Sequence, residues 1–260
     1  MIVAVGVEYL GTSYSGWQRQ SHSPSVQAHV EAALSKVANH PIGVYCAGRT
    51  DSGVHALGQV IHFETDVSRP EKAWVLGGNA HLPDDISIIW ARQMSDDFHA
   101  RYSALSRRYR YVIANQKPRP AVLTGQVTWI RNPLDESLMH EAAQALVGEQ
   151  DFSSFQASSC QSPTPFRNVF QVKVFRKGPY VIIDITANAF LHHMVRNIAG
   201  SLICVGRKEQ SVSWIKELLE KKDRTQAAPT AKPDGLYFIQ ANYGNTVNIP
   251  KPEQGLWMLD

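Results

Sequence analysis

One short stretch of the sequence gathers side chains that can do chemistry. Residues 46–56 read CAGRTDSGVHA, which places a carboxylate, Asp51, two residues after a guanidinium, Arg49. Gly48 and Gly53 permit backbone angles that a Cβ forbids, so the stretch is predicted to form a tight, exposed loop. Loops on a rigid scaffold often carry catalytic groups. The alternative is an ordinary hairpin turn in which Asp51 only bonds nearby backbone N–H groups.

The chemistry open to this loop depends on the charge of Asp51. A neighbouring cation such as Arg49 favours the ionised carboxylate, which suits a nucleophile or a base better than a proton donor. The sequence contains no GxxxxGK[ST], GxGxxG or HExxH motif, so nucleotide, dinucleotide and zinc-protease chemistry lack their signatures. The three cysteines are far apart and show no CxxC spacing, which argues against a disulfide framework and a structural zinc site.

Arginines and tyrosines alternate in a second stretch, which reads FHARYS at 98–103 and RRYRY at 107–111. Side chains alternate between the two faces of a strand, so Arg108 and Arg110 should share one face while Tyr109 lies on the other. Nucleic-acid grooves use this mixture, because arginine pairs with phosphates and aromatic rings stack on bases. The alternative is an edge strand whose arginines are simply solvated.

Two further motifs follow in the second half of the chain. FLHHMVRN at 190–197 predicts the start of a helix, on which His192 and His193 would point about 100° apart and would not chelate one metal ion well. On such a helix Arg196 would share a face with His192. DFSSF at 151–155 is predicted to form a packed turn.

The whole chain has the composition of an ordinary globular protein, with 260 residues, 43% hydrophobic and 19% charged, and a formal net charge of +3. The N-terminus enters a strand pattern directly, without the basic and apolar regions of a signal peptide. No apolar run approaches the length of a membrane span. These features, with the odd cysteine count, predict a cytoplasmic protein that does not bind membranes.

Hydrophobic periodicity predicts the same order of elements, β-α-β-β-α-β, in each half of the chain. In the first half the expected strands are 2–9, 42–47, 59–64 and 86–92, and the helices are 26–37, capped by Ser25, and 70–80. In the second half the expected strands are 109–114, 169–175, 181–186 and 236–242, and the helices are 137–147, 192–205 and an additional one at 213–221.

This order is the split βαβ, or ferredoxin-like, arrangement. We therefore expect a mixed α/β (α+β) fold, in which two such halves form a continuous, mostly antiparallel sheet with a central cleft. The expected N-terminal half is 1–104 and carries the Asp51 loop. The expected C-terminal half is 105–245 and binds RNA, and an extended tail follows at 246–260.

Separate blocks between about residues 1 and 245 resemble the tRNA pseudouridine synthase A (TruA) family. These blocks are GWQRQ at 16–20, GRTDSGVHA at 48–56, DFHAR at 97–101, RYRY at 108–111, DFSSF at 151–155, FLHHMVRN at 190–197 and GLY at 235–237. The family more often has alanine at the position of Ser52 and phenylalanine at the position of Trp17.

The resemblance implies a pseudouridine synthase fold and the isomerisation of uridine to pseudouridine in the anticodon stem-loop of tRNA, at tRNA positions 38–40. Asp51 matches the essential aspartate of the family, which attacks C1′, adds to C6 or removes a C2′ proton. All three alternatives stay open, and each needs the ionised carboxylate. The reaction transfers no electrons or groups, so the resemblance implies no cofactor and no metal ion.

The resemblance also implies how the substrate is bound. Tyr109 matches the tyrosine that lies against the target base, which must leave the helical stack to react, and its phenol is a candidate for assisting loss of the C5 proton. The other candidates for substrate binding are Arg49, His55, Arg101, Arg108, Arg110 and Arg196. The family is homodimeric, with tRNA lying across both subunits.

Two other functional classes compete with an RNA-modifying isomerase. An RNA-binding module would use the same arginines and tyrosines, but it would not need a carboxylate facing an anionic ligand. A hydrolase with Asp51 as its nucleophile would need a second acid or a metal site, which the motif does not supply.

Overall fold

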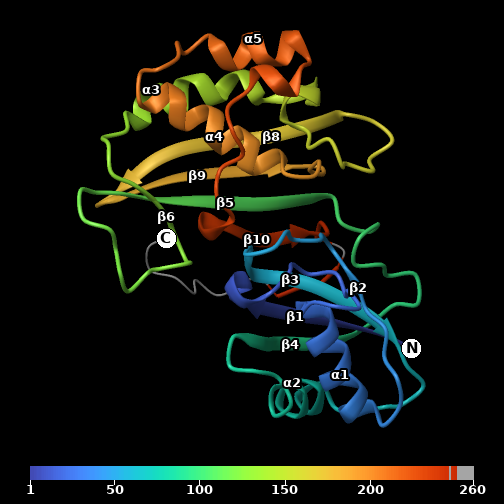
Figure 1. Cartoon of the computed structure of the whole chain (residues 1–260). Helices are drawn as coiled ribbons and strands as arrows, with labels where there is room; N and C mark the ends of the chain where they lie inside the picture. The colour runs from blue at the N-terminus through green and yellow to red at the C-terminus, as the bar shows by residue number, and fades with distance from the viewer. Residues whose placement is uncertain (246, 251–260) are drawn as a thin grey trace. The chain divides into compact units, whose positions relative to one another are not determined.

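The computed structural model describes residues 1–245 and 247–250, which form two compact units (Figure 1). The first unit is Met1–Leu105 together with the strand and loop from Tyr237 onward, and the second is Ser106–Leu236. Both units combine helices with mostly antiparallel strands, which confirms the mixed α/β class. No helix in the described part of the chain is long and apolar enough to cross a bilayer.

The first unit follows the predicted order β-α-β-β-α-β and adds one strand from late in the chain. Its elements are β1 (Ile2–Tyr9), a 3-10 turn (Gly11–Ser13), α1 (Val26–Ala38), β2 (Tyr45–Cys46), β3 (His55–Glu64), α2 (Glu71–Asn79), β4 (Ile86–Met94) and β10 (Leu236–Asn242). Strand β1 pairs antiparallel with β3 and β4, and β2 pairs antiparallel with β3. Strand β10 pairs parallel with β3.

The division of the chain depends on this last pairing. Tyr237 and Phe238 lie opposite His55 and Ala56, so β10 contributes to the sheet of the first unit. The order of elements along the sequence instead predicts this strand in the C-terminal half, 105–245. Of the tail expected at 246–260, only residues 247–250 are among the described residues.

Helix α2 packs against the strands of the first unit through large apolar side chains. The rings of Phe63 on β3 and Trp74 on α2 meet edge to face with centroids 5.1 Å apart. Gly78 on α2 allows close approach to β4, because a Cβ there would lie 2.4 Å from the Cδ1 atom of Ile88. Ser25 stands at the N-cap of α1 as predicted, but its hydroxyl makes no capping hydrogen bond.

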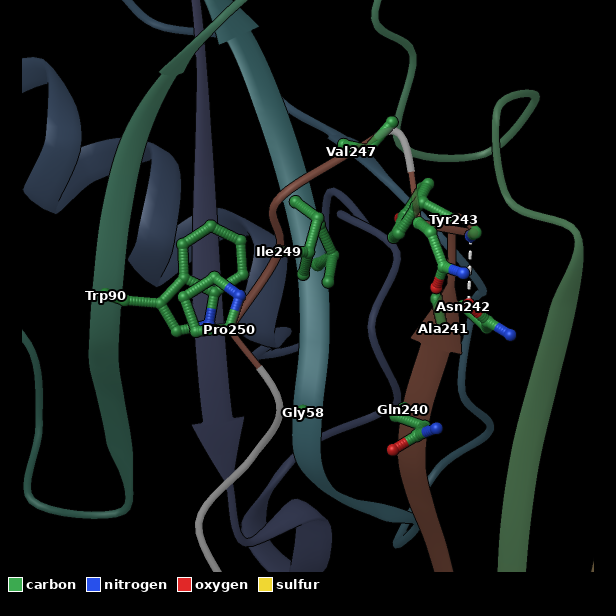
Figure 2. A pocket seen from close by; sticks show the side chains of 12 residues that line it. Gly58, Trp90, Gln240, Ala241, Asn242, Tyr243, Val247, Ile249 and Pro250 are labelled. Atoms are coloured by element: carbon green, nitrogen blue, oxygen red, sulfur yellow. Dashed lines mark hydrogen bonds between the residues drawn. The ribbon is translucent and has the colours of Figure 1, made fainter.

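A hollow in the first unit lies between β3, β4 and the chain that follows β10. Trp90, Ile249 and Pro250 are among the side chains that line it (Figure 2). The Arg92 guanidinium donates a hydrogen bond to the carbonyl oxygen of Asn248. The segment 247–250 is therefore tied back to β4.

The second unit follows the predicted order as far as β-α-β-β-α, because its expected last strand is β10 of the first unit, and it adds short extra elements. Its elements are β5 (Ser106–Asn115), β6 (Thr128–Ile130), α3 (Glu136–Ala143), β7 (Gly148–Asp151), β8 (Phe166–Lys177), β9 (Tyr180–Ala187), α4 (Met194–Gly206), α5 (Trp214–Lys221) and 3-10 turns at Gln144–Leu146, Ser153–Phe155, Arg224–Gln226 and Pro233–Gly235. The sheet runs β5-β9-β8-β7 with antiparallel neighbours, and β6 pairs parallel with β5. Helix α3 contacts β8, where the Val174 N–H donates to His140 Nδ1.

Several predicted elements have other bounds in the structure, such as the strand expected at 59–64, which begins at His55, and the helix expected at 137–147, which ends at Ala143. For two elements the reason is identifiable. The strand expected at 42–47 shrinks to Tyr45–Cys46, because α1 side chains bind the preceding backbone N–H groups. Ile42 N donates to Ser35 Oγ, and Val44 N donates to a carboxylate oxygen of Glu31. These groups are therefore satisfied without a neighbouring strand.

The helix expected at 192–205 begins instead at Met194. His193 has a φ of 61°, which is left-handed and ends any helical path toward the N-terminus. His192 and His193 therefore precede the helix. The prediction that they lie on it is wrong, and the expected angle between them and the expected shared face with Arg196 lose their basis. The short strands β6 and β7 were not predicted, since three or four residues give too little periodicity.

Candidate active site

The Asp51 loop joins β2 to β3, and its base is closed by backbone and side-chain hydrogen bonds. Ala47 N donates to the carbonyl oxygen of Val60 at 2.8 Å, which extends the hairpin one residue beyond β2. The Gln59 amide then bridges Gly48, donating to its carbonyl oxygen at 2.6 Å and accepting from its N–H at 3.4 Å. Gln59 is fully buried, so these bonds are shielded from water.

Thr50 anchors the loop directly before Asp51. Its carbonyl oxygen accepts from Trp17 N at 3.0 Å, and its hydroxyl is 2.8 Å from the Tyr9 hydroxyl. Gly16 has a φ of 90°, and a Cβ there would lie 2.7 Å from the Thr50 carbonyl oxygen. The GWQRQ block therefore packs against the Asp51 loop, and only glycine fits at its first position.

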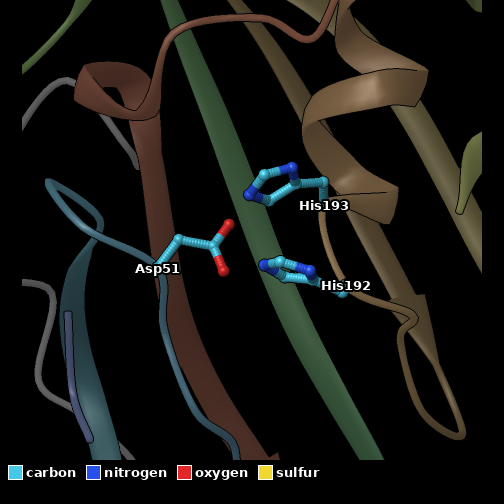
Figure 3. Close-up of side chains that lie close together, drawn as sticks. All are labelled: Asp51, His192 and His193. Carbon is cyan, nitrogen blue, oxygen red and sulfur yellow. The ribbon is translucent and has the colours of Figure 1, made fainter. Parts of the chain in front are cut away.

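The far side of the loop rests on Tyr14. The Tyr14 carbonyl oxygen accepts from Ser52 Oγ at 3.2 Å and from Gly53 N at 3.3 Å. Gly53 has a φ of 77°, and Val54 N closes the turn by donating to the Asp51 carbonyl oxygen. The backbone on both sides of Asp51 is thus fixed, while its side chain is partly exposed and projects from the loop (Figure 3).

His55 lies beneath the loop at the start of β3. Its side chain is fully buried, its Nδ1 accepts from Gly11 N at 2.9 Å, and its ring lies 4.7 Å from that of Tyr237. A ring nitrogen that accepts from a backbone N–H carries no proton, so the imidazole is neutral with its proton on Nε2. His55, predicted as a substrate-binding residue, is therefore buried beneath the loop and supports it.

Two candidate arginines of the first unit, Arg49 and Arg101, are exposed, and their charges act on the thiol of Cys46. Burial raises the pKa of the Cys46 thiol to about 11, and the positive charges of Arg49 and Arg101 act in the opposite direction. Arg49 itself is exposed, and the Arg101 guanidinium lies over the ring of Tyr102 at 5.6 Å from its centroid. The proposed charge partnership of Arg49 with Asp51 stays a prediction.

Tyr109 lies within β5 of the second unit, with 8% of its surface exposed. The ring of Phe190 packs against it edge to face, with centroids 4.9 Å apart. Such a contact orients the tyrosine ring and restricts its rotation. The preceding residue on the same face, Arg107, donates to the carbonyl oxygen of Asn188.

Arg108 and Arg110 share the other face of β5, as strand alternation predicted, and both bind Asp184 on β9. Arg108 donates to both carboxylate oxygens, and Arg110 Nε donates to Oδ2 at 2.8 Å. Burial alone would raise the pKa of Asp184, but the hydrogen bonds and charges of the two arginines lower it below its usual value. Asp184 was not among the predicted site residues, although a single aspartate within the apolar run 180–185 was a signal.

Arg196 and the two histidines lie around the start of α4. Arg196 Nε donates to the carbonyl oxygen of Ala231 at 2.9 Å. The imidazole rings of His192 and His193 have centroids 4.0 Å apart, and Figure 3 shows them side by side before the helix. The turn predicted at 151–155 is confirmed, with Asp151 Oδ1 accepting from the N–H and hydroxyl of Ser153.

Comparison with known proteins supports the resemblance over nearly the whole chain. A family model described as tRNA pseudouridine synthase matches residues 6–103 and 142–244. The chain is 59% identical to tRNA pseudouridine synthase A of Shewanella frigidimarina (strain NCIMB 400), with full coverage of both chains. It is 58% identical to the protein of that name from Shigella boydii serotype 4 (strain Sb227), covering 97% of this chain and 94% of the relative.

The family model and the relatives together define a tRNA-modifying isomerase. The chain belongs to the tRNA pseudouridine synthase family. The predicted resemblance is confirmed, and with it the class of enzyme.

Proposed function

We propose that this enzyme converts uridine to pseudouridine in the anticodon stem-loop of tRNA, with Asp51 as its essential carboxylate. The observation that carries the proposal is the support of the Asp51 loop. Thr50 and Ser52, the residues on either side, are held by Trp17, Tyr9 and Tyr14, while the carboxylate projects from the loop. Such preorganisation holds a reacting group in place without further ordering during the reaction.

The isomerisation needs the glycosidic bond between N1 and C1′ to break and a bond between C5 and C1′ to form. Asp51 serves in its ionised form, by attack at C1′, by addition to C6, or by removal of the C2′ proton. The C5 hydrogen leaves as a proton and N1 gains a proton, so no electrons or groups are transferred, and the proposed reaction uses no cofactor and no metal ion.

Tyr109 is the proposed stacking partner of the uracil. A base inside a helix must be extruded before it can react, and stacking on an aromatic ring offsets part of that cost by about 1–3 kcal/mol. The edge contact with Phe190 supports this role, because it presents the tyrosine ring in one orientation.

Arginines on both units are the proposed partners of the tRNA phosphates. These are Arg49, Arg101, Arg108, Arg110 and Arg196. Arg108 and Arg110 share one carboxylate, so the pair keeps about one net positive charge toward RNA. His55 is buried, and we propose that it acts on the substrate only by supporting the loop.

The remaining proposals concern the setting of the reaction. We propose that the N-terminal half carries the catalytic loop, that the C-terminal half contributes most of the RNA contacts, and that the enzyme works as a homodimer in the cytoplasm. The proposed binding partner of the enzyme is tRNA, and we propose that the enzyme does not bind a membrane.

Tritium release from tRNA labelled at uracil C5 tests the proposal, because forming the C5–C1′ bond expels the C5 hydrogen. Asp51→Asn should lose about 10⁴-fold or more in turnover. Its stability should change by no more than about 0.5 kcal/mol, because the side chain is partly exposed, and tRNA binding should survive. Asp84→Asn makes the same chemical change on an exposed turn and should leave turnover intact.

The outcomes separate the competing classes. Release by the wild type and not by Asp51→Asn supports the isomerase and the role of Asp51. Binding of tRNA without release by the wild type would instead identify an RNA-binding module. An Asp51→Asn variant that fails to fold would give Asp51 a structural role.

A further inference from the structure

Four aromatic and imidazole rings form a continuous cluster on the first unit, which we call the ring platform. Its members are Tyr45 on β2, His62 on β3, and His99 and Tyr102 in the turn after β4. Tyr45 is 60% exposed and Tyr102 is 76% exposed, whereas His62 is 3% exposed. Exposed tyrosines at both ends of a packed cluster are unusual, because large rings normally bury their faces.

The rings hold one another in place. Tyr45 stacks on His62 at a centroid distance of 5.2 Å and an interplanar angle of 20°, and His99 lies 4.5 Å from His62 and 4.3 Å from Tyr102. Backbone donors fix the imidazoles, since Ala100 N donates to His62 Nδ1 at 3.1 Å. The N–H groups of Arg101 and Tyr102 donate to His99 Nδ1 at 3.1 and 3.3 Å.

The surroundings of the two imidazoles in the platform favour their neutral forms, and guanidinium groups lie beside the platform. Burial lowers the pKa of His62 to about 4, and burial together with the Arg101 charge lowers the pKa of His99 below its usual value. The Arg101 guanidinium lies over the Tyr102 ring, and the charges of Arg101 and Arg49 both act on Cys46, next to Tyr45. Flat neutral rings next to guanidinium groups match the two parts of a nucleotide, a base and a phosphate.

We infer that the ring platform stacks an unpaired base of the tRNA substrate, with Arg101 binding an adjacent phosphate. The inference rests on the proposed function and adds a second base contact to the one proposed at Tyr109. Stacking tolerates any base, because every base has a π face, so the platform contributes affinity and positioning without reading sequence.

The test is a double variant, Tyr45→Ala with Tyr102→Ala, compared with the double phenylalanine variant as a matched control. We expect the alanine variant to raise the Kd for tRNA and the KM in tritium release by about 10- to 100-fold, with kcat within about twofold. The phenylalanine variant keeps both rings and should bind within about twofold of the wild type. Tyr102→Ala alone, at the more exposed position, serves if the double variant folds poorly.

Salt dependence separates the stacking part from the phosphate part. The alanine variant should show the same slope of log affinity against log salt concentration as the wild type. Arg101→Ala should give a slope shallower by about one, as expected for the loss of a phosphate contact.

Three results would overturn the inference. The first is an alanine variant with unchanged Kd and KM, and the second is a phenylalanine variant as weak as the alanine variant, which would point to the hydroxyl groups. The third is a sedimentation coefficient of the alanine variant that differs from that of the wild type in the absence of tRNA, which would make the platform a contact between copies of the chain. In each case tritium release by the wild type would leave the proposed function standing, whereas its absence would remove the proposed function itself.

Discussion

The Asp51 loop and strand β5 both carry charged residues that the sequence marks as functional, but they are held in different ways. Long-range contacts hold the loop, since Thr50 binds Trp17 and Tyr9, which precede it by more than thirty residues. A regular ladder with β9 holds β5 over most of its length. The loop leaves its carboxylate projecting, while β5 pairs Arg108 and Arg110 with Asp184 on the neighbouring strand.

This difference indicates which changes each region tolerates. A few specific contacts position the loop, so one substitution can displace Asp51. The ladder distributes the support of β5 over many backbone hydrogen bonds, so a side-chain change there should alter charge and stability while the strand stays in place.

Among changes outside the proposed site residues, Gly16→Ala should have the largest effect, because it acts on the support of the loop. The added Cβ would lie 2.7 Å from the Thr50 carbonyl oxygen, at a φ of 90° that alanine rarely adopts. We expect a loss of about 1–3 kcal/mol in stability. Displacement of Asp51 by about 1 Å should lower turnover on the order of 10²-fold. Thermal unfolding and tritium release measure the two effects.

Gly43→Ala is the matched control in the same unit. Nothing lies within 4 Å of the position that its Cβ would occupy. Stability should change by about 0.5 kcal/mol or less, and turnover should be that of the wild type. Full turnover by Gly16→Ala would contradict the claim that this contact positions Asp51.

Asp184→Asn should have an intermediate effect and should act mainly on stability. It removes the carboxylate that Arg108 and Arg110 share, and their side chains are 33% and 15% exposed, so solvent partly screens the loss. We expect urea unfolding at pH 7 to show a loss of about 1–3 kcal/mol. The kcat of tritium release should change less than about threefold. A larger loss of kcat would show that β5 positions its arginines as strictly as the loop positions Asp51.

The pH dependence of the same variant checks the cause. The pKa of Asp184 is lower in the folded state than its usual value. The folded state therefore gains stability from the ionised carboxylate above about pH 4 and loses it as the pH falls through the lowered pKa. The difference between wild type and Asp184→Asn should shrink below about pH 4, and a constant difference would point to a packing effect.

Tyr109→Phe should have the smallest effect on binding, because it keeps the ring that packs against Phe190. The Kd for tRNA should stay within about twofold, whereas Tyr109→Ala should weaken binding by about 5- to 100-fold. A loss of kcat at unchanged Kd would give the phenol a part in removing the C5 proton. Loss of binding by the phenylalanine variant would instead identify the hydroxyl as a structural hydrogen-bonding group.

Sequence periodicity predicted the regular elements well where apolar residues recur over many turns. The strands at 2–9 and 236–242 have the predicted bounds, and the first helix differs by one residue at its end. The predicted bounds were wrong where one side-chain hydrogen bond or one backbone angle determines where an element begins or ends. Glu31 and Ser35 bind the backbone of the expected strand at 42–47, and the left-handed His193 delays the start of α4.

The sequence by itself determined the family, the order of elements and the position of the carboxylate, because these depend on local patterns and on matched blocks. Only the tertiary structure decided what surrounds them. It brings Gly16 and Trp17 into contact with the Thr50 carbonyl oxygen and pairs Asp184 with Arg108 and Arg110. It also pairs β10 with β3. Such contacts join residues far apart in the chain, and their geometry depends on strand register and helix packing, which no local pattern of residue types specifies.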